Sequence, residues 1–163
     1  MSDDKENIDV TEQSRLFNRA VVRYDFVEAY NQYMKIARDY GTGETINMVE
    51  VHTLTLIEEH PGIMAKDVAS MWNRTKGAVS QTLAKLEKRG LIERRKENGN
   101  SKNVHIYVTH EGKKLSETHR AYDLKQLIWA DKELLKDFDQ NEVAVFYRVM
   151  EKYTALMYRM SKE

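Results

Sequence analysis

The segment from Lys76 to Lys88 carries the side chains whose types and spacing best suit contact with a partner molecule. In a helix, Val79, Leu83 and Leu86 recur at i, i+4 and i+7 and form one buried face. The opposite face combines small, hydroxyl, amide and cationic groups: Lys76, Gly77, Ser80, Gln81, Ala84, Lys85 and Lys88. Glutamine can bind adenine through two hydrogen bonds, small residues allow close approach, and lysine suits phosphate. The mixture predicts a helix that contacts base edges in a DNA major groove.

An ordinary surface helix is the alternative for this segment. Such a helix usually carries Glu and Lys four residues apart, whereas this face has no acid before Glu87. The 163-residue chain has 26 basic and 26 acidic residues, but from Lys66 to Lys102 ten basic residues face four acidic ones, a net charge of +6. Met1–Glu12 carries −4. A basic region in an acidic chain is typical of nucleic-acid binding, although a solvated face can explain part of it.

The neighbouring segments have the order of a winged helix-turn-helix. Asn47 and Glu50 have capping-box spacing, which predicts a helix that begins there and that Pro61-Gly62 ends. The elements expected next are helices over 65–72 and 76–89, the latter ended by Gly90, and strands over 91–96 and 104–109. Between the strands, residues 97–103 are expected to form a flexible basic and polar loop.

Longer helices are expected on either side of this module, over 14–40, 109–131 and 139–160. Their apolar stripes, such as Phe146, Met150 and Tyr153, are too apolar to face water, which favours a dimer over packing within one chain. The predicted fold class is mainly α with a small β-hairpin wing. The predicted domains are a disordered acidic leader (1–13), a winged helix-turn-helix (46–109) and a helical dimerisation region (14–45 and 110–163).

From Asn47 through Gly112, and in its outer helices, the sequence resembles the MarR family of bacterial transcriptional regulators. The resemblance rests on NRTKGAVSQTLAKLEKRGLIERR (residues 73–95) and on VTHEGKKL (residues 108–115), which contains a Leu/Val-Thr-x-x-Gly signature. It implies a homodimer in which the first and the last two helices interlock with those of the partner. The family wing often reads Asp-x-Arg, its Arg entering the minor groove, whereas this chain has Asn100 and Lys102 at those places.

The residues expected to contact DNA are Lys76, Gly77, Ser80, Gln81, Lys85, Arg95, Asn100, Ser101 and Lys102. Strand alternation sends Arg95 to the side opposite its two basic neighbours. Arg95 and Lys102 are expected to carry the wing contact, Ser101 to bind phosphate, and Asn100 to hold the tip through its own backbone. Lys102 can neutralise a phosphate or enter a narrow minor groove, and its strongly hydrated ammonium favours phosphate.

The resemblance also implies a pocket for a small-molecule effector between the dimer helices and the winged helix. The residues that can line it are Tyr30, Tyr33, Met34, His52 and Trp72. Packing in a hydrophobic core explains each of these residues at least as well.

Several other classes of protein are excluded or disfavoured. The absence of cysteine excludes disulfides, a Cys-ligated metal and a Cys nucleophile. The five histidines lack a metal-binding pair, since His110 has Lys114 one turn on and His119 lies nearly opposite. No phosphate-binding glycine loop or nucleophile–base motif is present, so no catalytic residue, metal, cofactor or enzyme activity is expected. No apolar run approaches the ~18 residues of a membrane span, which predicts a cytoplasmic protein.

The leading prediction is a dimeric, sequence-specific regulator of transcription that binds double-stranded DNA. A repressor that binds a near-palindromic operator and is released by a ligand fits this prediction best. The alternative is a winged-helix module that binds another protein and no DNA, because that fold also serves as a docking surface. The acid-free helix face and the basic loop favour DNA.

Overall fold

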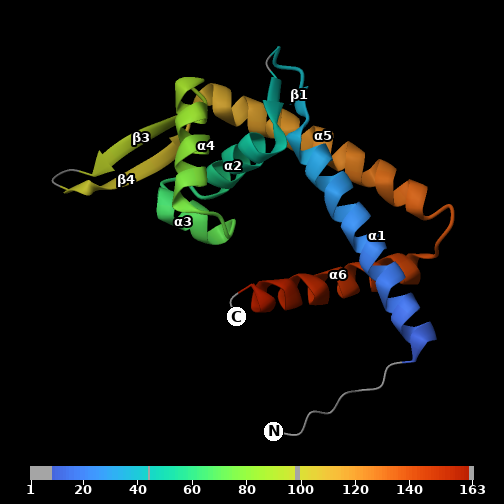
Figure 1. The fold of residues 1–163 in the computed structure, drawn as a ribbon. Helices are drawn as coiled ribbons and strands as arrows, with labels where there is room; N and C mark the ends of the chain where they lie inside the picture. The colour runs from blue at the N-terminus through green and yellow to red at the C-terminus, as the bar shows by residue number, and fades with distance from the viewer. Residues whose placement is uncertain (1–8, 44, 98–99, 162–163) are drawn as a thin grey trace, which may run out of the picture. The chain divides into compact units, whose positions relative to one another are not determined.

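The computed structural model describes residues 9–43, 45–97 and 100–161, and it leaves out the side chains of 97 and 100–102. The chain divides into two compact units, Met1–Ser116 and Glu117–Glu163. Helix α5 (His110–Leu134) begins in the first unit and continues in the second (Figure 1).

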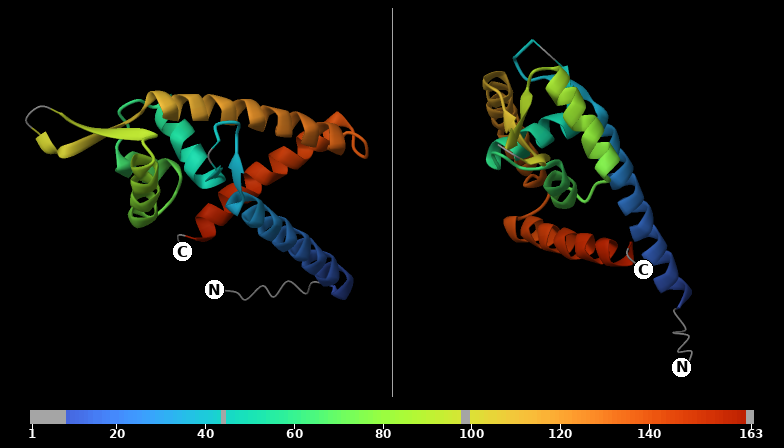
Figure 2. Two further views of the ribbon diagram at one scale, coloured as in Figure 1. Left: turned by 90° about the horizontal axis from the view of Figure 1, so that it is seen from above. Right: turned by 90° about the vertical axis from the view of Figure 1, so that its left-hand side faces the viewer.

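The first unit holds four complete helices and two small antiparallel sheets (Figure 1). Its helices are α1 (Val10–Lys35), α2 (Met48–Glu59), α3 (Ala65–Met71) and α4 (Lys76–Lys88). Its strands are β1 (Ala37–Asp39), β2 (Thr45–Asn47), β3 (Ile92–Glu97) and β4 (Asn100–Val108). The β3–β4 hairpin projects beyond α2, α3 and α4, as Figure 1 and the left view of Figure 2 show. The mainly helical fold with a hairpin wing is confirmed.

The core of the first unit gathers apolar side chains from α2, α3, α4 and the hairpin. Leu54 and Ile57 of α2 are fully buried, as are Leu83 and Leu86 of α4, and Ile106 of β4 is almost so. Val79, Leu83 and Leu86 are the buried residues of α4, which confirms the predicted face of that helix. Burial of this face fixes which side of α4 remains in solvent.

Local capping signals place the helix ends where the sequence predicts them. The Asn47 side chain accepts the Glu50 backbone N–H at 2.9 Å at the start of α2. Asp139 and Glu142 form a reciprocal capping box at the start of α6 (Gln140–Met160). Gly90, with φ +68°, follows the end of α4 in the left-handed conformation that glycine adopts most easily.

The first helix differs from its predicted extent of 14–40 at both ends. It begins at Val10, and it stops at Lys35 because residues 37–39 form β1, which pairs with β2 from Ala37↔Asn47 to Asp39↔Thr45. The Asp39 carboxylate accepts backbone N–H groups of the three residues 41–43 at 2.8–3.0 Å. An Asp that binds its own neighbouring backbone in this way competes with a continuing helix.

The wing hairpin closes more tightly than predicted. Strands β3 and β4 pair in register from Ile92↔Val108 to Lys96↔Val104, and after a register shift Glu97 pairs with Asn100. Only positions 98 and 99, which lie outside the described residues, separate the two strands. The expected loop over 97–103 is therefore wrong, because the backbone from Asn100 onward belongs to β4.

The loop between α2 and α3 is fixed onto β4. Gly62 N–H donates to the Ile106 carbonyl at 2.9 Å, and Ile63 forms an antiparallel bridge with Ile106. The Nδ1 atom of His105 lies 2.8 Å from the Gly62 carbonyl oxygen. Gly62 has φ +84°, a conformation that glycine adopts most easily, and a Cβ there would lie 3.0 Å from the Tyr107 hydroxyl.

The start of α5 is locked to the turn that follows α4. The Thr109 hydroxyl donates to the Gly90 carbonyl at 2.7 Å and accepts the Gly112 N–H at 3.1 Å, while Thr109 N–H donates to the Leu91 carbonyl at 3.1 Å. A Cβ on Gly112 would lie 2.0 Å from the Leu91 carbonyl oxygen. The Thr-x-x-Gly signature is therefore a cap combined with a close approach of two backbones.

The second unit consists of the rest of α5 and of α6. Many of its large apolar side chains are exposed, among them Leu127 and Trp129 of α5 and Phe146, Tyr147 and Tyr158 of α6. Among the described residues, no helix combines the length and the apolar character that a membrane span requires.

We expect Gly112→Ala to lower the free energy of unfolding by about 1–3 kcal/mol or more, because the new methyl group overlaps the Leu91 carbonyl. Gly77→Ala is the matched control, since it lies in a helix and its Cβ would meet no atom within 4 Å. That control should raise the free energy of unfolding by up to about 1 kcal/mol. Urea unfolding of both variants tests this expectation. A Gly112→Ala protein as stable as the wild type would contradict it.

Candidate nucleic-acid interface

The exposed face of α4 presents the side chains that the sequence predicts for contact with base edges. Lys76, Gly77, Ser80 and Gln81 are all exposed, whereas Val79, Leu83 and Leu86 of the same helix are buried. The Thr75 side chain caps the helix by accepting the Ala78 N–H at 3.3 Å. With no acid in its first turn, this end of α4 keeps the positive end of the helix dipole.

The turn between α3 and α4 depends on Asn73. Its φ of +46° makes it a non-glycine residue with positive φ, a conformation that Asn tolerates better than most residues. Backbone bonds from Asn73 N–H to Ser70 O (3.2 Å) and from Arg74 N–H to Ala69 O (2.9 Å) close the end of α3. This turn directs the chain into α4 and leaves Arg74 exposed beside Lys76.

Lys85 of this helix forms an ion pair with an acidic residue of α2. Its Nζ atom lies 3.3 Å from Glu50 Oε1, and an Arg89 guanidinium nitrogen lies 3.6 Å from Glu50 Oε2. The Lys85 side chain nevertheless keeps 65% of its surface exposed. Sequence reasoning missed this acid, because Glu50 has the spacing of a capping-box residue and nothing local indicates a partner on α4.

The wing strands carry two arginines with different partners. Arg94 Nε lies 3.0 Å from Glu87 Oε2 on α4. Arg95 pairs with Glu93, and its guanidinium lies 4.6 Å from the centre of the Tyr107 ring. The two neighbouring arginines thus contact different sets of residues, as strand alternation predicts.

Three of the predicted wing residues lie where only the backbone is described. Asn100, Ser101 and Lys102 belong to β4, and their side chains are outside the described part of the structure. Their roles at the DNA stay predictions.

The residues predicted to line an effector pocket form two ring pairs in the first unit. The Tyr30 and Tyr33 rings of α1 stack with centroids 6.3 Å apart, and the His52 and Trp72 rings stack at 6.2 Å. Met34 is partly buried on α1. The effector pocket stays a prediction.

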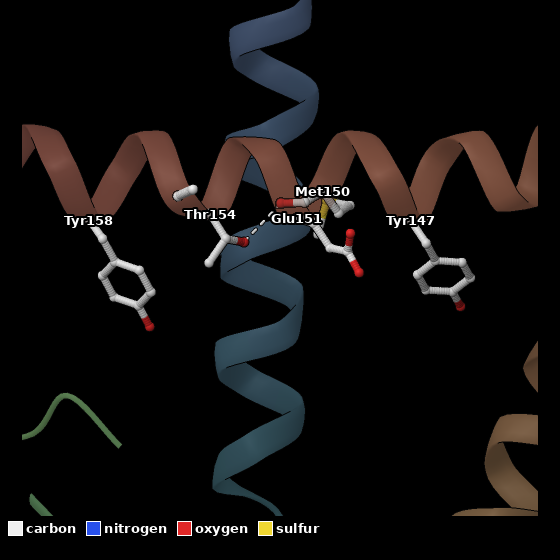
Figure 3. A pocket seen from close by; sticks show the side chains of 6 residues that line it. Tyr147, Met150, Glu151, Thr154 and Tyr158 are labelled. Carbon is white, nitrogen blue, oxygen red and sulfur yellow. Dashed lines mark hydrogen bonds between the residues drawn. The ribbon is translucent and has the colours of Figure 1, made fainter. Parts of the chain in front are cut away.

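A shallow cavity of about 450 Å³ lies along α6 (Figure 3). It is lined by Tyr147, Met150, Glu151, Thr154, Ala155 and Tyr158, which follow one another along a single helix. The Thr154 hydroxyl donates to the Met150 carbonyl at 2.9 Å, so its polar group is satisfied within the helix. None of the predicted effector residues belongs to this cavity.

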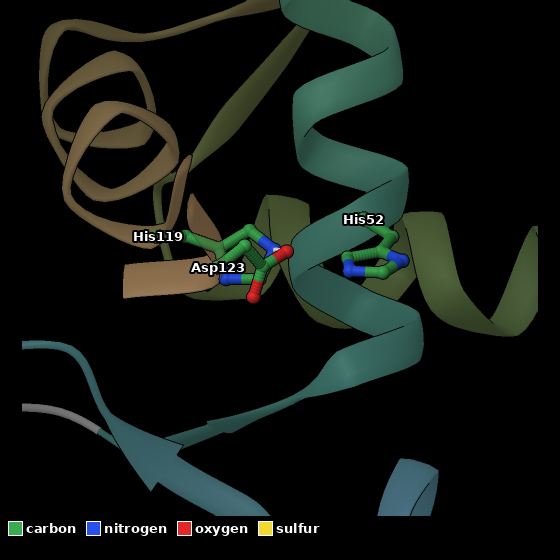
Figure 4. A group of neighbouring side chains, drawn as sticks. All are labelled: His52, His119 and Asp123. Carbon is green, nitrogen blue, oxygen red and sulfur yellow. Dashed lines mark ion pairs between the residues drawn. The ribbon is translucent and has the colours of Figure 1, made fainter. Parts of the chain in front are cut away.

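In the second unit, His119 Nε2 lies 3.0 Å from Asp123 Oδ2, one turn further along α5 (Figure 4). This pair supplies two of the four ligands that a structural zinc site uses. The expectation of no metal stays a prediction.

Helices α2, α3 and α4 with the β3–β4 wing define a winged helix-turn-helix protein. Residues 46–104 match the sequence model of the MarR family, so the chain carries a MarR-family domain, as the sequence resemblance indicates. The MarR family comprises transcriptional regulators and not enzymes.

Individual relatives agree with this family assignment. The uncharacterized HTH-type transcriptional regulator YhjH of Bacillus subtilis is 27% identical over 136 residues, which cover 82% of this chain and 75% of YhjH. The MarR family transcription regulator SP03579 shares the fold, with a TM-score of 0.75, 17% identity and coverage of 94% of this chain and 97% of that one. Streptococcus pneumoniae FabT, solved in complex with DNA, has a TM-score of 0.65, 18% identity and coverage of 91% and 99%.

We expect Asn73→Val to destabilise the fold by about 1–2 kcal/mol, because a β-branched residue is strained at positive φ. Asn73→Gly should leave the free energy of unfolding within about 1 kcal/mol of the wild type. Thermal and urea unfolding of the two variants measure the difference. Equal stability of the valine and glycine variants would show that this backbone conformation does not control the turn.

Proposed function

We propose that this protein is a dimeric, sequence-specific regulator that binds double-stranded DNA by placing α4 in the major groove. The observation that carries the proposal is the exposed, acid-free face of α4 from Lys76 to Gln81, set opposite a fully buried face. The fold shared with FabT, which was solved in complex with DNA, supports it.

The side chains of this face divide into two roles. Ser80 and Gln81 offer hydrogen bonds to base edges, and Gly77 lets the helix backbone approach the groove closely. Lys76 at the start of the helix suits a phosphate, as does Arg95 on the wing. We propose that Ser101 and Lys102 extend the wing contact to the backbone, while Asn100 holds the tip.

We propose that residues 46–109 form the DNA-binding module and that 14–45 and 110–163 form the dimerisation region. Exposed apolar side chains on α1 and α6, such as Phe17, Val22, Phe146 and Tyr147, support this division, because a single subunit leaves them in water. A two-fold dimer implies a near-palindromic operator with half-site centres about 10–10.5 base pairs apart, or a multiple of that.

We also propose that the protein represses transcription and that a small molecule releases it from the operator. Tyr30, Tyr33, Met34, His52 and Trp72 are the residues that we propose for the effector. Their aromatic surface suits a flat, largely apolar ligand.

We expect Gln81→Ala to weaken binding to the specific operator by about 1–3 kcal/mol, the range of one good base contact. Affinity for random duplex DNA should change little, because that binding depends on phosphates. The measurement is a mobility-shift titration of DNA from upstream of the protein's own gene, with random duplex as the control. An equal loss on both DNAs would place Gln81 on the backbone only. No binding of the wild type to any DNA would favour the protein-interaction module.

We expect the protein to sediment as a dimer at micromolar concentration. Deletion of 139–163 removes α6 with its apolar side chains and should cause aggregation or unfolding, because the dimer buries that surface. Sedimentation velocity and circular dichroism distinguish the outcomes. A well-folded monomer from this truncation would contradict the proposed dimerisation region.

A further inference from the structure

Glu50 is an acidic side chain held almost out of solvent within the DNA-binding module. It lies in the first turn of α2, where Asn47 binds its backbone N–H, and 10% of its side-chain surface is exposed. A carboxylate at this end of a helix is stabilised by the helix dipole. Its charge still requires cationic partners, since burial of an unpaired carboxylate is costly.

Both partners of Glu50 come from the second half of α4 and the residue that follows it. Arg89 lies 3.6 Å from one carboxylate oxygen, and only 24% of its side chain is exposed, so it belongs to the packed side of the contact. Lys85 lies 3.3 Å from the other oxygen and keeps 65% of its side chain exposed. Lys85 is thus the member of this cluster that phosphate can also reach.

Lys76, at the other end of α4, provides the comparison. It is exposed on the same helix, and the described residues place no acid against it. A lysine that already neutralises a partly buried carboxylate releases fewer counterions when DNA binds than a lysine that faces only solvent. The two lysines of one helix should therefore contribute unequally to DNA binding.

We infer that Glu50 is a positioning residue that withholds Lys85 from DNA phosphates and so lowers the sequence-independent affinity of the protein for DNA. The inference rests on the proposed function, because it assigns a role within the same DNA-binding surface. Through the Lys85 pair, Glu50 limits binding to the many sites that lack the operator sequence, where phosphate contacts supply nearly all the affinity.

The test measures the affinity for random duplex DNA against salt concentration. Glu50→Gln should steepen the slope of log K against log salt by about 0.9 for each additional phosphate that Lys85 neutralises, or about twice that when both subunits of the proposed dimer bind. Because one such phosphate is worth about eightfold at 0.1 M relative to 1 M salt, the affinity at 0.1 M should rise several-fold. The double variant Glu50→Gln/Lys85→Ala should lose this increase and have a slope no steeper than that of the wild type.

Two controls keep the result specific to Lys85. Glu59→Gln makes the same charge change at the exposed far end of α2 and should leave the slope unchanged. In the otherwise wild-type protein, Lys85→Ala should reduce the slope by less than half as much as Lys76→Ala. The comparison of Lys85→Ala with Lys76→Ala tests the inference even if Glu50→Gln does not fold.

The outcomes separate this inference from the proposed function. A wild-type protein that binds no DNA at any salt concentration overturns both. A wild type that binds DNA with the same slope as Glu50→Gln overturns only the inference. So does a steeper slope that persists in the double variant, or an equal loss from Lys85→Ala and Lys76→Ala.

Discussion

The backbone contact between Gly112 and Leu91 is the constraint on which the rest of the first unit depends. A side chain at position 112 would place its Cβ 2.0 Å from the Leu91 oxygen, so no residue other than glycine fits without a shift of the chain. Thr109 reinforces the contact through its bonds to Gly90, Leu91 and Gly112. The end of α4, the start of β3 and the start of α5 thus meet at one point.

This junction determines what the functional surface can do. It sets the direction in which the wing leaves the end of α4, and the bonds of Gly62 and His105 fix the other wing strand to the loop after α2. The proposed recognition of DNA needs α4 and the wing to keep a constant spacing, because each would contact its own groove or phosphates. These anchors supply that rigidity without using any side chain of the exposed face of α4.

The sequence predicted those features that local signals control. The cap at Asn47 and the glycine after α4 act within four residues of themselves, so their positions could be derived directly. The β1–β2 hairpin was missed because the expected first helix extended to residue 40, across β1, whereas Asp39 binds the backbone of the following turn instead. The partners of Glu50 were missed because ion pairs between segments far apart in the chain produce no periodic pattern in the sequence.

The net charge of the basic segment does not show which of its basic residues are available to a partner. Glu87 pairs with Arg94, Glu93 pairs with Arg95, and Glu50, which lies outside that segment, pairs with Lys85 and Arg89. Exposed ion pairs are weak and can exchange for phosphate, whereas a pair with a nearly buried carboxylate exchanges less readily. The basic residues therefore differ in how readily they can bind phosphate. Lys76 faces only solvent within the described structure, and Arg94 and Arg95 can exchange their exposed partners for phosphate. Lys85 is paired with the nearly buried Glu50 and exchanges less readily. A count of charges along the sequence treats them alike, and the packing of α2 against α4 is what separates them.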